Sequence, residues 1–196
     1  GAGVSTESGI PDYRGPGGSL HDHRPMTYQE FRYDDDARQR YWARSYVGWR
    51  RMRRAQPNRA HYALAELEQL GAISGVITQN VDGLHARAGS RNLLALHGDL
   101  SRIICLDCGQ DEGRESLDAR LDAANPGYLD RLEGRDLRVN PDGDVELDQQ
   151  YIQDFRMVPC LGCGSTRLKP DVVYFGESVP AERKARKDAM LAECSA

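Results

Sequence analysis

Apolar residues recur at helical spacing in two neighbouring stretches of the chain. The first stretch is predicted to be a helix over residues 35–54, with its apolar positions at Ala37, Tyr41, Ala43 or Arg44, Val47 and Met52. A Gln-Pro pair breaks this pattern, and Asn58 is a good N-cap for a second helix that ends at Gly71. The apolar stripe of the second helix consists of Ala60, Ala63, Leu64, Leu67 and Leu70.

Short apolar runs follow these helices and predict strands. Residues 72–78 read as a buried strand, residues 93–96 as a second strand, and residues 171–175 as a last strand that ends at Gly176. Helices that alternate with short buried strands are typical of an α/β fold with a parallel sheet. We therefore expect an α/β fold.

Polar side chains stand directly after two of these strands. Gln79, Asn80 and Asp82 follow the first, and His97 follows the second. Ligands of open α/β sheets bind beyond the carboxyl ends of the strands, so these residues are candidates for a ligand site. A capped turn, with Asp82 as the N-cap of a helix through Ala88, explains the first group equally well. His97 could act as a base near neutral pH, although a lone histidine is more often structural.

Composition limits the classes of function. The 196 residues are 39% hydrophobic, which is enough for a folded core. The net charge of −4 argues against nucleic-acid binding, and no apolar run is long enough to span a bilayer, so no membrane partner is expected. The basic run at residues 50–54 is read as a solvated helix face. Without a signal peptide, we expect a cytoplasmic protein if the source is bacterial, or a mitochondrial matrix protein if it is eukaryotic.

Four of the five cysteines form two C-x-x-C pairs, Cys105 with Cys108 and Cys160 with Cys163. In a reducing compartment these pairs predict one tetrahedral Zn²⁺, and four thiolates leave no open coordination position for catalysis. The metal is therefore expected to be structural, with residues 109–159 looping out between the pairs. Four unrelated buried thiols are the alternative. Cys194 stands alone and is expected to be inert.

The chain begins with a glycine-rich segment. Glycines at positions 1, 3 and 9 would let the backbone approach a phosphate, but they do not fit the common G-x-G-x-x-G spacing. A plain tight turn is about as good an interpretation. Arg14 could pair with a diphosphate or could be a surface arginine.

Together these motifs resemble the sirtuins, the NAD-dependent protein deacylases. The resemblance is carried by the segments 1–14, 78–82, 96–98 and 169–177 and by the four cysteines. Finer features resemble class II, the branch of the mitochondrial sirtuin 4: Asp12-Tyr13-Arg14, Arg40-Tyr41-Trp42-Ala43-Arg44, and the long acidic segment between the cysteine pairs.

The resemblance implies two domains. A Rossmann-like NAD-binding domain would cover residues 1–100 and 165–196, and a smaller zinc-binding domain residues 101–164, with helices of about residues 20–56 contributing to the small domain. The strand before Gly1 and the C-terminal loops that bind the adenosine half of NAD are absent. We therefore expect a fragment that is truncated at both ends, binds NAD poorly and is poorly active alone.

The resemblance also implies roles for individual residues. His97 would be the general base and Asn80 the second catalytic residue. An acyl-lysine protein substrate would pair with Val173, Phe175, Gly176 and Glu177. The residues that would bind NAD are Gly1, Ala2, Gly3, Ser5, Ile10, Pro11, Asp12, Tyr13, Arg14, Gln79, Asn80, Asp82 and His97. The implied reaction releases nicotinamide and forms O-acyl-ADP-ribose.

The acyl group is less well defined. Desuccinylating sirtuins carry a Tyr-x-x-Arg pair at the positions of Ser45 and Gly48, and here Tyr41 and Arg44 form that pair one helical turn earlier. We therefore expect longer, branched or lipoyl-like acyl groups rather than succinyl, or ADP-ribosyl transfer to protein. Alternatives are a mono-ADP-ribosyltransferase and an inactive zinc-stabilised binding module. A dehydrogenase is disfavoured by the four cysteines and the glycine spacing.

Overall fold

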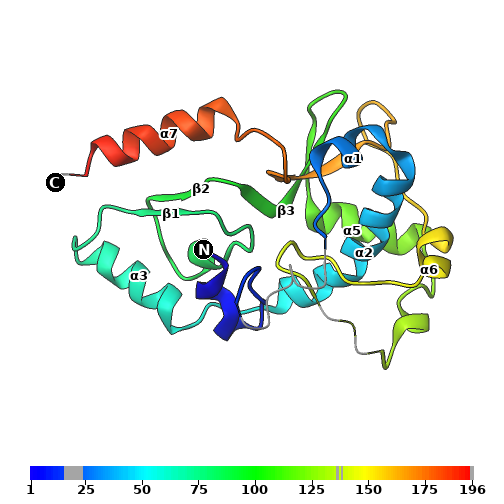
Figure 1. Cartoon of the computed structure of the whole chain (residues 1–196), viewed down its shortest axis with the longest axis horizontal. Helices are drawn as coiled ribbons and strands as arrows, with labels where there is room; N and C mark the ends of the chain where they lie inside the picture. Colours follow the sequence, from blue (N-terminus) through cyan, green and yellow to red (C-terminus); the bar gives the residue numbers. More distant parts are fainter. Residues whose placement is uncertain (16–23, 136, 138, 195–196) are drawn as a thin grey trace.

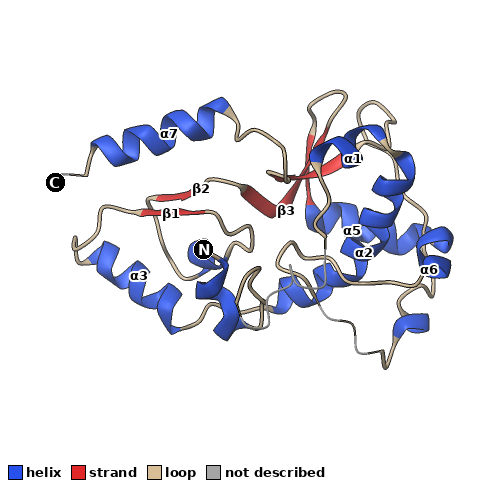
Figure 2. Cartoon of the chain, in the orientation of Figure 1, coloured by secondary structure: helices blue, strands red, loops and turns tan. Residues whose placement is uncertain are grey.

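The computed structural model describes residues 1–15, 24–135, 137 and 139–194. The order of elements is η1 (Ala2–Ser8), α1 (Tyr28–Tyr33), α2 (Asp35–Arg54), α3 (Arg59–Gln69), β1 (Val76–Thr78), α4 (Leu84–Arg87), β2 (Leu93–Ala95), β3 (Gly98–Cys105), β4 (Asp111–Gly113), α5 (Arg114–Ala124), η3 (Asp130–Leu132), α6 (Gln149–Asp154), β5 (Leu168–Val172) and α7 (Ala181–Ala192). Most of the helices lie in two groups, with α3 and α7 on the left and α1, α2, α5 and α6 on the right of Figures 1 and 2.

Strands β1 and β2 pair in parallel, which confirms the predicted α/β fold with a parallel sheet. Thr78 lies opposite Ala95 at the carboxyl end of the pair. Helices α3 and α7 lie beside this sheet, on the left in Figure 1. Because both strands end at the same edge, the polar residues that follow them are brought to one place.

A second sheet is antiparallel, with the strand order β4-β3-β5. Strand β5 covers Leu168–Val172, so the prediction of a strand over residues 171–175 was wrong by about three residues. Pro170 cannot donate a backbone hydrogen bond, and it lies on β5, which pairs only with β3 among the described residues and is thus an edge strand, the position in a sheet where proline is tolerated. Lys169 is buried in this strand although it is charged.

Helix α2 has the predicted bounds, because local signals stop it at both ends. The Asp34 side chain accepts a hydrogen bond from the Ala37 N–H, and the chain leaves the helix just before the Gln-Pro pair. The predicted N-cap of α3 is also confirmed, since the Asn58 side chain accepts from the Ala60 N–H.

The apolar stripe predicted for α3 is not buried in the structure. Leu67 and Leu70 are 40% and 73% exposed, and His61 and Ala65 are the buried residues of the helix. Ile77 of β1 is 36% exposed, so the prediction that this strand is buried holds only in part. The parallel sheet has two strands among the described residues and offers little surface to cover these side chains.

The main core lies around α2. Trp42, Tyr46 and Trp49 of this helix are buried against β3, α5 and the segment between the cysteine pairs. That segment does not simply loop out, because it forms α5, η3 and α6 and contributes Leu117, Leu121 and Tyr128 to the core. In Figure 1 α1 and α2 lie on the same side of the molecule as α5 and α6.

The proposed domain boundaries remain a prediction. This includes the expectation that helices of about residues 20–56 join the small domain, of which residues 20–23 lie outside the described part. One buried cluster includes residues of both predicted domains, among them Ile10, Leu84 and Leu117. Among the described residues, no helix has the length and apolar character needed to cross a membrane.

Candidate functional site

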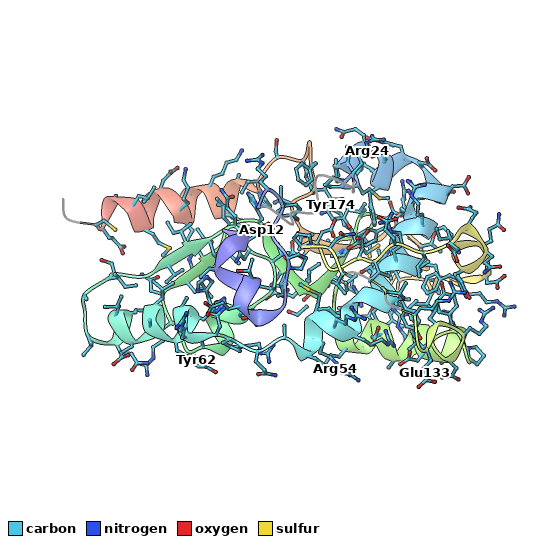
Figure 3. The ribbon with its side chains drawn as sticks, turned by 60° about the horizontal axis from the view of Figure 1, so that its bottom comes forward. Asp12, Arg24, Arg54, Tyr62, Glu133 and Tyr174 are labelled. Carbon is cyan, nitrogen blue, oxygen red and sulfur yellow. The ribbon has the colours of Figure 1, made fainter. Side chains whose placement is uncertain are left out.

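A cavity of about 600 Å³ lies between the N-terminal segment, the ends of β1 and β2, and the chain after β5. In Figure 3 Asp12 and Tyr174, which both line it, lie near the middle of the molecule, whereas Tyr62 lies at the outer edge. Pro11 and Gly176 are not among its lining residues. The candidate residues that do line it are Gly1, Ala2, Gly3, Ser5, Ile10, Asp12, Tyr13, Arg14, Gln79, Asn80, Asp82, His97, Val173, Phe175 and Glu177.

Ser5 connects the N-terminal segment to the loop after β1. It is fully buried, and its hydroxyl donates a 2.6 Å hydrogen bond to Asp82 Oδ2. The Ser5 hydroxyl oxygen in turn accepts a hydrogen bond from Asn80 Nδ2 at 3.1 Å. The two polar side chains after β1 are therefore oriented by one residue of η1.

His61, in the first turn of α3, contacts this network through Ser5. Its Nδ1 accepts the Asn58 N–H at 3.2 Å, which leaves Nε2 protonated in the neutral ring and 3.5 Å from Ser5 Oγ. Burial lowers its pKa, and Asp82 acts in the opposite direction. Sequence reasoning missed this residue, although its spacing of three from Asn58 is that of a capping box, which the structure contains.

Asp82 caps a turn, as one of the two sequence interpretations predicted, and it also lines the cavity. Oδ1 accepts from the Leu84 N–H at 2.9 Å, so the carboxylate caps the start of α4, although Gly83 is the formal N-cap. Oδ2 is held by Ser5 and faces the cavity with Asn80. The capped turn and the candidate ligand site are thus one structure.

His97 is placed by the close approach of β3 and β5. Gly98 has a φ of +89°, and a Cβ there would overlap the carbonyl oxygen of Asp171, so only glycine fits. The His97 carbonyl accepts the Val173 N–H at 2.8 Å. Burial lowers the pKa of His97, and the Arg183 guanidinium lowers it further. Both effects favour the neutral imidazole, which is the form that can accept a proton.

The segment after β5 forms the opposite wall. The Phe175 carbonyl accepts the Tyr28 N–H at 3.0 Å, and the Phe175 ring is 47% exposed and lies edge-on to Tyr13. The Glu177 carboxylate accepts the Tyr174 N–H at 2.8 Å and pairs with Lys169 at 3.0 Å. Among the candidate substrate residues, Glu177 is thus already engaged within the protein.

Part of the cavity lining consists of residues outside the predicted cofactor and substrate sites. These are Tyr41, Tyr174, Pro141 and Asp142, and their meeting depends on long-range packing that no local motif signals. Burial raises the pKa of Tyr41 to about 12 and that of Tyr174 above its usual value.

The predicted Tyr-x-x-Arg residues separate in the structure. Tyr41 lines the cavity, but the Arg44 guanidinium pairs with Asp144 at 3.2 Å and donates to the Val145 carbonyl at 2.7 Å. Arg44 is not among the lining residues. At Gly48, a Cβ would overlap the carbonyl oxygen of Gly143, so the turn at residues 139–145 occupies the space beside this position.

The four paired cysteines come together as predicted. Their sulfur atoms all lie within 4.8 Å of one another, with Cys105 to Cys163 at 3.6 Å and Cys108 to Cys160 at 3.7 Å. Tetrahedral Zn²⁺ with Zn–S bonds of about 2.3 Å needs sulfurs about 3.8 Å apart, so these residues fit the ion. Cys194 lies apart on the exposed end of the chain.

Comparison with known proteins agrees with these features. The Sir2 family model matches residues 1–195. The NAD-dependent protein deacetylase 1 of Corynebacterium efficiens is 65% identical over 191 residues, which are 97% of this chain and 68% of that protein. The human mitochondrial NAD-dependent protein lipoamidase sirtuin-4 is 45% identical over 93% of this chain and 58% of its own length.

A solved structure shows the same similarity. The Sir2–p53 peptide–NAD+ complex has a TM-score of 0.65 and 30% identity, and the match covers 98% of this chain and 64% of that one. The chain therefore spans about two thirds or less of the length of these proteins.

Proposed function

Because this chain belongs to the Sir2 family, we propose that it works as an NAD-dependent protein-lysine deacylase that releases nicotinamide and forms O-acyl-ADP-ribose. One observation carries this proposal. His97, whose pKa is lowered, the polar pair Asn80 and Asp82, and the segment around Phe175 all line one cavity. A base, an orienting group and a peptide-binding edge are the parts that such a reaction needs.

The residues of the N-terminal segment and of the loop after β1 would hold the cofactor. NAD, when bound, supplies the ribose carbon that takes the acyl oxygen as nicotinamide leaves. Gly1, Ala2 and Gly3 would lie at the diphosphate, with Arg14 as a counter-charge. Asn80 and Asp82 would orient the carboxamide, because Ser5 fixes both side chains. His97 would accept a hydroxyl proton, since burial favours its neutral form.

The substrate would be an acylated lysine in a protein segment. The Val173 N–H and the Phe175 carbonyl are already bonded to His97 and Tyr28, so an extended peptide would add a strand by pairing with the remaining main-chain groups of residues 173–177. The zinc ion would hold the two cysteine knuckles together and take no part in the reaction, because four thiolates fill its coordination sphere.

The acyl end of the cavity favours groups other than succinyl. Ser45 and Gly48 offer no cation, and Arg44 is engaged by Asp144. Asp142 adds an acidic side chain to the lining, which disfavours a second carboxylate nearby. We expect longer, branched or lipoyl-like acyl groups. The similarity to relatives from Corynebacterium and Streptomyces favours the cytoplasm as the compartment over the mitochondrial matrix.

The test is nicotinamide release from NAD by the protein expressed from its complete open reading frame. A panel of acetyl-, succinyl-, lipoyl- and long-chain acyl-lysine peptides would be compared, with His97→Ala as the control. Release that requires an acyl peptide and His97 supports the deacylase. Release without an acyl peptide, with ADP-ribose on protein, would favour ADP-ribosyl transfer. No release with any peptide from folded, zinc-loaded protein would contradict the proposal.

A further inference from the structure

Lys169 is a buried cation close to the candidate substrate edge. It is 4% exposed, and its Nζ donates to the Val172 carbonyl at 2.5 Å. It also forms the 3.0 Å ion pair with Glu177. The ring centroids of Tyr174 and Tyr28 lie 4.7 and 5.8 Å from Nζ. The ammonium group is thus enclosed by one carboxylate, backbone oxygens and two aromatic rings.

Such an arrangement is a poor way to gain stability. Removing a cation and a carboxylate from water costs free energy that their attraction often does no more than offset, and apolar side chains of similar volume are often as stabilising. Burial accordingly lowers the pKa of Lys169, although Glu177 acts in the opposite direction. The ion pair between Lys169 and Glu177 is therefore better explained by the backbone arrangement that it holds than by the stability that it adds.

The geometry that it controls is that of residues 172–177. Lys169 holds the Val172 carbonyl at one end and the Glu177 carboxylate at the other, while Glu177 also holds the Tyr174 N–H. Outside this brace, the segment is tied to the His97 carbonyl through the Val173 N–H and to α1 through the Phe175 carbonyl. The brace thus fixes the segment between the candidate base and the start of α1.

We propose that Lys169 and Glu177 are positioning residues, which shape the backbone of residues 173–177 so that an acyl-lysine peptide can pair with it beside His97. This inference rests on the proposed deacylase function and deepens it. Glu177 then acts through the fold, by bracing the loop, because its carboxylate already bonds to Lys169 and to the Tyr174 N–H.

The experiment uses Lys169→Met, which keeps the volume and removes the charge, in the complete protein. We expect amide hydrogen exchange to rise in residues 173–177 and the KM for the acyl peptide to rise about tenfold. The kcat and the KM for NAD should stay within about twofold. Lys169→Arg, which keeps the charge, should restore most of the peptide KM, and Lys184→Met on the exposed face of α7 is the matched control.

Glu177→Gln provides a second variant in case Lys169→Met does not fold, because it keeps the shape and an acceptor for the Tyr174 N–H. It should raise exchange and peptide KM in the same direction, and its effects should not add to those of Lys169→Met. Unchanged exchange in residues 173–177, or a loss of NAD affinity together with peptide affinity, would overturn the proposal. If the wild-type protein shows no acyl-dependent reaction, the proposed function fails, and the exchange data still decide whether the brace exists.

Discussion

The Ser5 hydroxyl donates a 2.6 Å hydrogen bond to Asp82, and this contact joins the first element of the chain to the loop after β1. Ser5 also accepts from Asn80, so one buried oxygen orients both polar side chains of the candidate cofactor site. The site therefore depends on how η1 packs against the sheet and α3, and less on the loop itself.

Replacing Ser5 with alanine should therefore impair the reaction far more than its small volume suggests. Asp82 and Asn80 each lose a partner, and an unsatisfied buried polar group costs about 1–3 kcal/mol. We expect kcat/KM for nicotinamide release to fall by about one to two orders of magnitude. Thr6→Ala is the control, because the hydrogen bond that the Thr6 hydroxyl donates to the Gly3 carbonyl is exposed. Equal activities of the two variants would rule out the orienting role.

The pH dependence of the reaction should follow His97. Burial and the Arg183 charge lower its pKa, so kcat/KM should fall on the acid side with a midpoint below the usual value of about 6.5. Removing the positive charge in Arg183→Gln should raise the pKa and move this midpoint upward. Arg186→Gln, on the same helix, should leave it in place. A midpoint that moves downward in Arg183→Gln would contradict the assignment of His97 as the base.

The zinc site should carry a large share of the stability of the chain. We expect one zinc ion per chain, and Cys108→Ser or a strong chelator should remove it. The loss should cost at least about 4 kcal/mol, which corresponds to a Tm lower by roughly 8–16 °C for a domain of this size. Metal analysis and thermal unfolding measure both effects. Cys194→Ser should retain the metal and the Tm, and a full zinc content in Cys108→Ser would refute the ligand set.

Features with local signals could be predicted from the sequence. The bounds of α2 follow from an acidic N-cap and a Gln-Pro break, and the zinc site follows from two C-x-x-C pairs. The polar residues after β1 and β2 were found because parallel strands end at a common edge. Each of these inferences uses residues that are close in sequence, or residue types such as paired cysteines whose metal chemistry is specific.

Features that depend on long-range packing could not be predicted. His61 could not be identified because nothing in the neighbouring sequence shows that α3 packs its first turn against Ser5. Strand β5 was predicted about three residues too far along the chain, because a lysine and a proline are unusual in a buried strand. The ion-pair partner that allows Lys169 to be buried, Glu177, lies beyond the end of the strand. Tyr41 and Asp142 meet at the cavity only after the segment between the cysteine pairs has folded onto α2.

The packing of the segment between the cysteine pairs onto α2 leads to a prediction about Gly48. A Cβ there would overlap the Gly143 carbonyl, so the turn at residues 139–145 packs directly against α2. Gly48→Ala should destabilise the protein by about 1–3 kcal/mol through overpacking, although alanine is the better helix former by about 1 kcal/mol. Gly113→Ala is the matched control, because a Cβ at Gly113 meets no heavy atom within 4 Å.

Urea unfolding of both variants measures the effect on stability, and the acyl-peptide panel measures the effect on the cavity. Because Pro141 and Asp142 belong to the same turn and line the cavity, its displacement in Gly48→Ala should also change the KM for acyl peptides. The KM for NAD should change less, because the candidate cofactor residues lie on η1 and after β1. A Gly48→Ala protein as stable as Gly113→Ala, with an unchanged preference among acyl groups, would show that this turn does not form the acyl end of the cavity.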